Sequence, residues 1–139
     1  MTPEQVNLVQ TSFQKVLPIK DTASDLFYGR LFEIDPVVRS FFPSDLTGQR
    51  KKLMAALATV VSGLSLPDSI LPTVKALGVK HVEYGVNATH YGTVGEALIW
   101  TLEQGLGDEF TPQVRDAWIA AYTLLSNVMI EAAEQSQAA

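Results

Sequence analysis

The chain has 139 residues, of which 47% are hydrophobic and 18% are charged, which is enough apolar material for one globular domain and too little charge for a disordered chain. Its 10 Lys and Arg against 15 Asp and Glu give a net charge of −5, which argues against nucleic acid or an anionic membrane as a partner. The lack of cysteine excludes disulfides, thiolate metal ligands and thiol nucleophiles, and it is compatible with a reducing compartment.

No segment is typical of a secretory signal or a membrane anchor. The first residues, MTPEQ, contain neither a basic nor an apolar run. The uncharged stretch over residues 53–67 has 15 residues, fewer than the roughly 18–20 that a bilayer-spanning helix needs. We therefore expect a cytoplasmic protein in which this stretch is a buried helix.

Apolar residues recur at intervals of three and four along most of the chain, and no run alternates with the period of two that a half-buried strand needs. The sequence therefore predicts an all-helical fold. Thr2, followed by Pro3, is expected to cap a first helix that closes at Pro18. The next expected boundaries are a cap at Asp21 or Thr22, an end at Asp35 and Pro36, a short turn up to Phe42, and a loop over residues 43–48.

The second half of the chain shows the same spacing, interrupted by Gly and Pro. A fourth helix is expected to be capped by Asp68 or Ser69, with Pro72 tolerable only in its first turn. The other expected features are a third helix from about residue 47 to Gly63, a corner over residues 85–90, a fifth helix ending at Gly105 and Gly107, and a last helix from Thr111 and Pro112. We expect a single domain over residues 1–139 in which residues 134–139 fray.

His81 lies on the apolar stripe of the fourth predicted helix, where it follows Val74 and Leu77 at helical spacing. Such a histidine is either a core residue bonded to a backbone carbonyl or a metal ligand. His90 is the only other histidine, so a zinc site would need carboxylates to complete it. A haem iron, by contrast, needs as little as one axial imidazole from the protein.

Several short segments carry a further pattern: FYGRLF at 27–32, DP at 35–36, FFP at 41–43, residues 49–54, KHVEYGV at 80–86, HY at 90–91, DAW at 116–118 and AY at 121–122. In order and spacing they resemble the single-domain bacterial globins, which are relatives of the haem domain of flavohaemoglobins. The resemblance covers essentially the whole chain. It implies the globin fold, a three-on-three helical sandwich around haem b (iron protoporphyrin IX).

The resemblance assigns His81 as the proximal ligand of the haem iron and Phe42 as an aromatic side chain that packs on the porphyrin. One nitrogen of His81 can bind iron while the other donates to a carbonyl one turn back, which we expect to be that of Leu77. Without the resemblance, Phe42 would be interpreted as a core aromatic that anchors a loop.

The resemblance also assigns Tyr28, Gln49 and Leu53 to the distal pocket. Dioxygen on ferrous iron carries partial negative charge, which the Tyr28 hydroxyl and the Gln49 amide could each stabilise by about 1–3 kcal/mol. Leu53, one turn after Gln49, would keep water out. Taken alone, Gln49 could be an exposed glutamine and Tyr28 a surface residue. No distal histidine is present, so we expect an open or water-occupied sixth site.

Other residues receive weaker assignments. Lys52 and Lys80 are candidates to pair with the haem propionates, although isolated lysines are often simply solvated, and His90 has no assigned role. The candidate haem-wall residues, any of which could instead be helix–helix core, are Leu57, Leu77, Val86, Val94 and Leu98.

The chain departs from the flavohaemoglobin pattern on the proximal side. In those proteins a Tyr ten residues after the proximal His and a Glu on the last helix support that His. Tyr91 matches the first, but Ala133 stands at the second position, and Glu131 and Glu134 lie on other helical faces. This relay is therefore expected to be incomplete, which puts peroxidase-like or fast nitric oxide dioxygenase chemistry in doubt.

We therefore predict a haem globin that reversibly binds dioxygen and other diatomic gases, such as nitric oxide and carbon monoxide, for storage, delivery or scavenging. It is primarily a binding protein. The alternative is a nitric oxide dioxygenase that takes electrons from a separate reductase, since Gly105-Leu106-Gly107 follows no strand and is not a dinucleotide fingerprint. A gas sensor is disfavoured because no room is left for a transmitter domain. A cofactor-free helical interaction module with a buried His81 is the third possibility.

Overall fold

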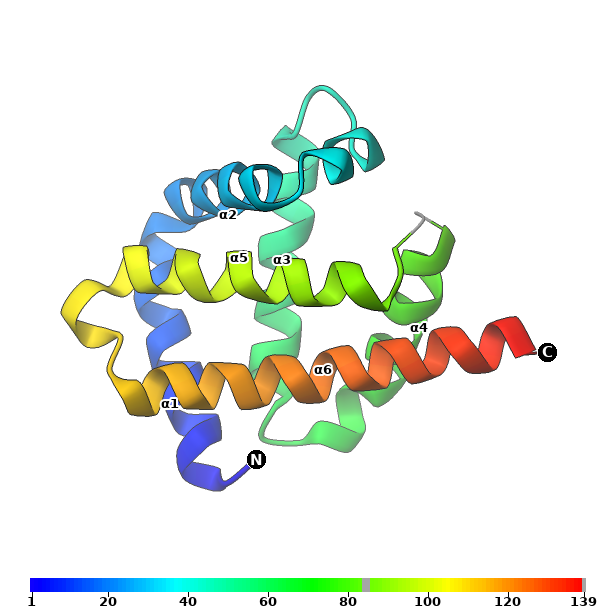
Figure 1. The fold of residues 1–139 in the computed structure, drawn as a ribbon. Helices are drawn as coiled ribbons and strands as arrows, with labels where there is room; N and C mark the ends of the chain where they lie inside the picture. Colours follow the sequence, from blue (N-terminus) through cyan, green and yellow to red (C-terminus); the bar gives the residue numbers. More distant parts are fainter. Residues whose placement is uncertain (84–85, 139) are drawn as a thin grey trace.

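The computed structural model describes residues 1–83 and 86–138, and within these ranges every regular element is a helix (Figure 1). The α-helices are α1 (Pro3–Val16), α2 (Lys20–Ile34), α3 (Thr47–Gly63), α4 (Pro67–Glu83), α5 (Ala88–Leu106) and α6 (Pro112–Ala138). The short 3₁₀ helices are η1 (Leu17–Ile19), η2 (Pro36–Phe41) and η3 (Gly107–Glu109). The all-helical prediction is therefore confirmed.

The α-helices form two crossed layers. In Figure 1, α2, α5 and α6 run across the view, and α1, α3 and α4 cross behind them. Within the first layer α5 contacts both α2 and α6, and between the layers α6 packs on α1 and on α4. This arrangement confirms the predicted three-on-three helical sandwich.

Buried apolar side chains form two clusters. The larger cluster fills the space between α1, α2, α5 and α6 and includes Val9, Ala97 and Ala117, which are 0% exposed. The smaller cluster joins one buried residue from each of α3, α4, α5 and α6, namely Val60, Val74, Tyr91 and Met129. The chain thus has a main core and a second, smaller one that lies where α4 meets α5 and α6.

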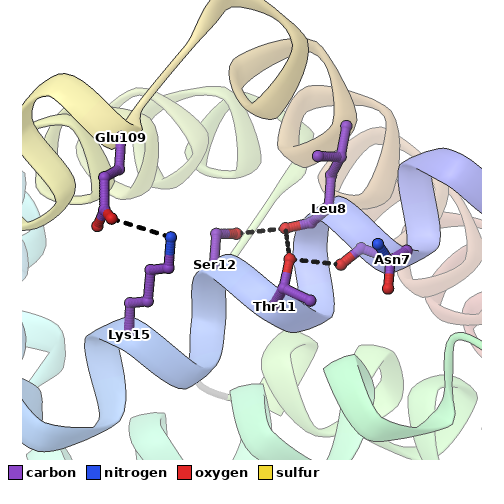
Figure 2. A network of polar contacts seen from close by, with 6 residues as sticks. All are labelled: Asn7, Leu8, Thr11, Ser12, Lys15 and Glu109. Carbon is purple, nitrogen blue, oxygen red and sulfur yellow. Dashed lines mark hydrogen bonds and ion pairs between the residues drawn. The ribbon is translucent and has the colours of Figure 1, made fainter.

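Polar contacts tie α1 to its neighbours. The Trp118 indole N–H donates to Ser12 Oγ at 2.8 Å, and Ser12 in turn donates to the Leu8 carbonyl at 2.6 Å. Figure 2 shows the Ser12–Leu8 bond together with the ion pair of Lys15 with Glu109, whose Nζ and Oε1 atoms are 3.0 Å apart. That pair is exposed and contributes little to stability. The buried Trp118–Ser12 bond is therefore the stronger of these two polar links.

Several predicted boundaries are confirmed in atomic detail. Thr2 caps α1 through a capping box, in which the Gln5 N–H donates to Thr2 Oγ1 at 3.1 Å and the Thr2 N–H donates to Gln5 Oε1 at 3.0 Å. The Val114 N–H donates to Thr111 Oγ1 at 3.2 Å at the start of α6. Gly107 ends α5 with a φ of 57°, a conformation that favours glycine.

Two predicted helix starts are wrong. Neither Asp21 nor Thr22 caps α2, because η1 continues directly into a helix that begins at Lys20. Likewise α4 begins at Pro67 rather than after a cap at Asp68 or Ser69. Proline suits the first helical position because its φ is preset and its missing N–H would have no partner there.

The early start of α4 also places Pro72 in its second turn, beyond the position in which we expected it to be tolerated. Pro72 cannot donate to the Asp68 carbonyl, as a residue four positions later in a helix normally does. Both residues are exposed, so water can take the place of the missing donor.

The predicted corner is shorter than residues 85–90. Residues 88–90 belong to α5, which Asn87 caps by accepting the Thr89 N–H at 3.0 Å. Gly85 lies outside the described residues.

The structure continues α6 to Ala138 through Glu, Gln and Ala, which are favourable helix formers, and the fraying of residues 134–139 stays a prediction. No helix in the described parts of the chain has the length and apolarity needed to cross a membrane.

Candidate functional site

His81 lies in the last turn of α4, and its ring is held by the preceding turn of the same helix. Its Nδ1 lies 2.6 Å from the Leu77 carbonyl oxygen. A carbonyl oxygen can only accept, so Nδ1 carries the hydrogen and, in a neutral ring, Nε2 carries the lone pair. The predicted bond to Leu77 is confirmed, and it selects the tautomer in which Nε2 is the potential metal-binding atom.

The Tyr91 ring of α5 stacks on the His81 imidazole, with 6.3 Å between ring centroids and 28° between planes. Tyr91 is held in turn by Tyr122, whose hydroxyl donates to the Tyr91 carbonyl at 2.6 Å. A side chain at Gly95 would put its Cβ 2.8 Å from the Tyr122 ring, so the glycine makes room for this contact. The imidazole is therefore oriented by α4 along one edge and by α5 across its face.

The Tyr91 hydroxyl is buried and has no hydrogen-bond partner among the described residues. Burial raises the pKa of Tyr91 above its usual value. A phenol next to the candidate ligand is thus neutral and lacks an acceptor. Ala133, at the position where the flavohaemoglobin pattern has Glu, offers no side-chain polar atom to it.

Tyr28 and Gln49 are brought together from α2 and α3. The Tyr28 side chain is only 3% exposed, and its hydroxyl donates to the Gln49 backbone carbonyl over a long 3.5 Å. Burial raises the pKa of Tyr28, against the smaller lowering effects of the Gln49 side chain and Arg50. Gln49 is half-buried. The reading of these two as an exposed glutamine and a surface tyrosine is therefore wrong.

Aromatic side chains surround Tyr28. Its ring lies 5.0 Å from that of Phe27 and 5.6 Å from that of Phe42, edge to face in both cases. Phe42, which follows η2, also lies 5.7 Å from Phe32 and remains half-buried. Its contacts fit the predicted loop-anchoring role and leave part of the ring uncovered for another apolar group.

The predicted wall residues divide between the two clusters. Leu53, Leu57 and Leu98 line a small apolar pocket of about 20 Å³ next to the larger cluster, and Leu98 is fully part of that core. Leu77 and Val86 pack instead against the smaller cluster. Side chains that are apolar but only half-buried are Leu53, Leu57, Leu77, Val86 and Val94. The chain alone leaves these surfaces partly uncovered.

The charged candidates lie at the surface. Lys52 and Lys80 are exposed, and neither forms an ion pair within the described parts of the chain. Their assignment to carboxylate groups of a ligand stays a prediction.

His90 has a role that sequence reasoning missed. Its Nδ1 accepts the Asn87 N–H at 3.0 Å, which completes a capping box for α5, and its ring meets Phe41 of η2 edge-on at 5.2 Å. The capping signal was weak because Glu or Gln, not His, usually stands three residues after the cap.

These residues fit a flat apolar group held by one imidazole. His81 presents the correct tautomer, and half-buried apolar side chains come from α3, α4 and α5. Among the described residues no three His, Asp or Glu side chains gather to hold a metal ion. Haem iron, which takes most of its ligands from its macrocycle, would need only the one imidazole of His81 here.

Comparisons with known proteins identify the family. The globin family model matches residues 25–129. Over 133 residues the chain is 32% identical to the flavohemoprotein of Bordetella parapertussis and 29% identical to that of Rhodopirellula baltica. Both alignments cover 94% of this chain and 33% of the relative, so the chain spans about a third of the length of these proteins.

Solved structures show the same fold. An engineered carbene transferase, derived from a proposed nitric oxide dioxygenase of Rhodothermus marinus, is 26% identical with a TM-score of 0.88, over 99% of this chain and 96% of the other. A bacterial globin of Campylobacter jejuni is 21% identical with a TM-score of 0.82, over 99% and 100% of the two chains. The sequence, the crossed helices and the matched family model together confirm the predicted resemblance: the chain belongs to the globin family and has the globin fold.

Proposed function

We propose that this chain is a single-domain haem globin that reversibly binds dioxygen and other diatomic gases, with His81 as the axial ligand of haem b. The observation that carries the proposal is the bond from His81 Nδ1 to the Leu77 carbonyl, 2.6 Å long, beside apolar walls that the chain leaves half-buried. The haem iron would supply the site at which the gas binds. The side chains would supply the contacts to the macrocycle and the hydrogen bonds to the gas.

The apolar residues would hold the macrocycle and exclude water. Burying half-exposed apolar surface contributes about 25 cal/mol per Å² removed from water. Phe42 would add flat aromatic contact, and the exposed Lys52 and Lys80 could pair with the propionates. The residues whose remaining apolar surface would be covered are Leu53, Leu57, Leu77, Val86 and Val94.

On the distal side, Tyr28 and Gln49 would act as hydrogen-bond donors to a polar diatomic ligand. The Tyr28 hydroxyl now donates only over 3.5 Å to the Gln49 carbonyl, so turning it toward a better acceptor loses little. Burial keeps this phenol neutral and therefore able to donate. Both donors would slow the release of dioxygen.

A test of the distal assignment is the rate of dioxygen dissociation from the reduced, haem-loaded protein. Tyr28→Phe should release dioxygen faster, by about tenfold for each 1.4 kcal/mol of lost stabilisation. Ser126→Ala, which removes a buried hydroxyl bonded to the backbone of its own helix, serves as the control and should leave the rate nearly unchanged. Equal rates in wild type and Tyr28→Phe would reduce Tyr28 to a packing residue.

The similarity to the Rhodothermus marinus protein supports a second candidate function, nitric oxide dioxygenation. In that reaction one nitric oxide, one dioxygen and one electron give one nitrate, so a separate reductase would have to supply the electron. The unpartnered Tyr91 hydroxyl favours gas binding over this turnover, because no acceptor group strengthens the proximal side. Catalytic formation of nitrate with an added flavin reductase would show that the protein is a nitric oxide dioxygenase.

A further inference from the structure

Gly78 lies on α4 one turn before His81, at the point where the backbones of α4 and α6 touch. A Cβ added at Gly78 would stand 2.7 Å from Met129 Cα and 2.9 Å from Met129 C, and closest of all to the Met129 carbonyl oxygen. These are backbone atoms of a long helix, which cannot rotate away as the end of a side chain can. Any residue larger than glycine therefore requires α4 and α6 to separate.

This close approach belongs to the same packing unit as His81. Met129 is buried in the smaller cluster together with Tyr91, and the Tyr91 ring stacks on the His81 imidazole at 6.3 Å. The position of His81 relative to α6 is thus fixed by two contacts. One is the packing of α4 on α6 at Gly78, and the other is the Tyr91 ring, which shares a cluster with Met129 of α6. A change in the α4–α6 distance has to change the relation between the His81 ring and Tyr91.

Glycine is an unfavourable residue inside a helix compared with alanine, because it has more conformational freedom to lose. Some helical glycines of this chain have open space around them; a Cβ at Gly29 of α2, for example, would meet nothing within 4 Å, and those at Gly63 and Gly95 would meet side-chain atoms only. Helix formation alone therefore does not explain Gly78. Its distinguishing property is the contact with Met129.

We propose that Gly78 is a positioning residue for the axial ligand: by letting α4 rest on the α6 backbone, it sets the distance and tilt of the His81 imidazole relative to the iron. The inference rests on the proposed function in one respect, the binding of haem through His81. A methyl group at residue 78 would push the end of α4 outward and strain the bond between the His81 imidazole and the haem iron.

The test uses the full chain loaded with haem and reduced, in wild type, Gly78→Ala and the control Gly29→Ala. Resonance Raman spectroscopy reports the iron–imidazole stretching band, and transfer of haem to an excess of an apo-globin reports the rate of haem loss. Gly78→Ala should shift the band and lose haem about tenfold faster, equivalent to about 1.4 kcal/mol. Gly29→Ala should do neither.

A second comparison separates positioning from general destabilisation. In a His81→Ala background with added imidazole, the ligand is no longer tethered to α4, so Gly78→Ala should leave the band where it is. A shift that persists there would overturn the proposal, as would a normal band and normal haem loss in the single variant Gly78→Ala.

If Gly78→Ala does not fold, the test is made on the wild-type protein by NMR. The Gly78 α-protons should then give nuclear Overhauser contacts to the Met129 α-proton. The absence of these contacts would overturn the inference. A wild-type protein without any iron–imidazole band would instead overturn both this inference and the proposed function.

Discussion

The larger and the smaller cluster differ in how completely the chain itself buries them. In the larger cluster Val9, Ala97 and Ala117 are 0% exposed, and the buried indole N–H of Trp118 has an acceptor. In the smaller cluster Tyr91 is 9% exposed with an unpartnered hydroxyl, and the apolar side chains around it are half-buried. The part of the larger cluster between α1 and α6 is complete without a ligand, whereas the smaller cluster, like the α3 edge of the larger one, offers surface that a bound group would cover.

Removing the cofactor should therefore affect the two regions unequally, and this is the largest effect we expect. Free haem at about 1,000 times its dissociation constant would stabilise the folded protein by about 4 kcal/mol. Hydrogen exchange measured with and without haem should show lost protection in α4 and at the start of α5, and much smaller changes in α1 and α2. A uniform loss along the chain would contradict the division into two regions.

A change in the larger cluster should lower the stability of the fold and leave the haem site unchanged. Ser12→Ala removes the acceptor of the Trp118 indole N–H and leaves that donor buried, which costs about 1–3 kcal/mol. Urea unfolding should register the loss, while the visible spectrum of the haem-loaded protein stays the same. Ser40→Ala, which removes an exposed hydroxyl bonded to the Val37 carbonyl, is the matched control and should cost less than about 0.5 kcal/mol.

Alkaline pH should lower the stability by a lesser amount through Tyr122, which packs against the larger cluster and donates to the Tyr91 carbonyl of the smaller one. Burial and the neighbouring Tyr91 raise the pKa of Tyr122 from its ordinary value of 10.0. The unfolded chain therefore ionises first, so stability is fully present below about pH 10 and falls as the pH rises further. Urea unfolding between about pH 9 and 11 should show this decline, less steeply in Tyr122→Phe. An equal slope in the two proteins would mean that Tyr122 does not cause it.

Features set by residues three or four apart could be predicted from the sequence. The Thr2 capping box, the end of α5 at Gly107 and the bond from His81 to Leu77 all follow from local helical geometry. The start of α2 could not be predicted in this way, because η1 supplies backbone bonds where a capping side chain was expected.

Features that depend on how helices cross were missed for a different reason. Tyr122 reaches the Tyr91 carbonyl only because Gly95 leaves space for its ring, and Gly78 matters only because α6 passes directly over it. His90 contacts Phe41, a residue 49 positions earlier in the chain. None of these pairs has a spacing that a periodic pattern can show. The candidate site was predicted as a set of residues, but their packing required the fold.

The most direct test of the central claim, that His81 holds haem in this globin, is a haem titration of the apo-protein in wild type, His81→Ala and His90→Ala. Wild type and His90→Ala should bind one haem per chain and show an intense absorption band near about 400 nm with an iron–imidazole signature. His81→Ala should lose that signature and regain it with added imidazole. An unchanged signature in His81→Ala, or a colourless but folded wild-type protein, would contradict the account.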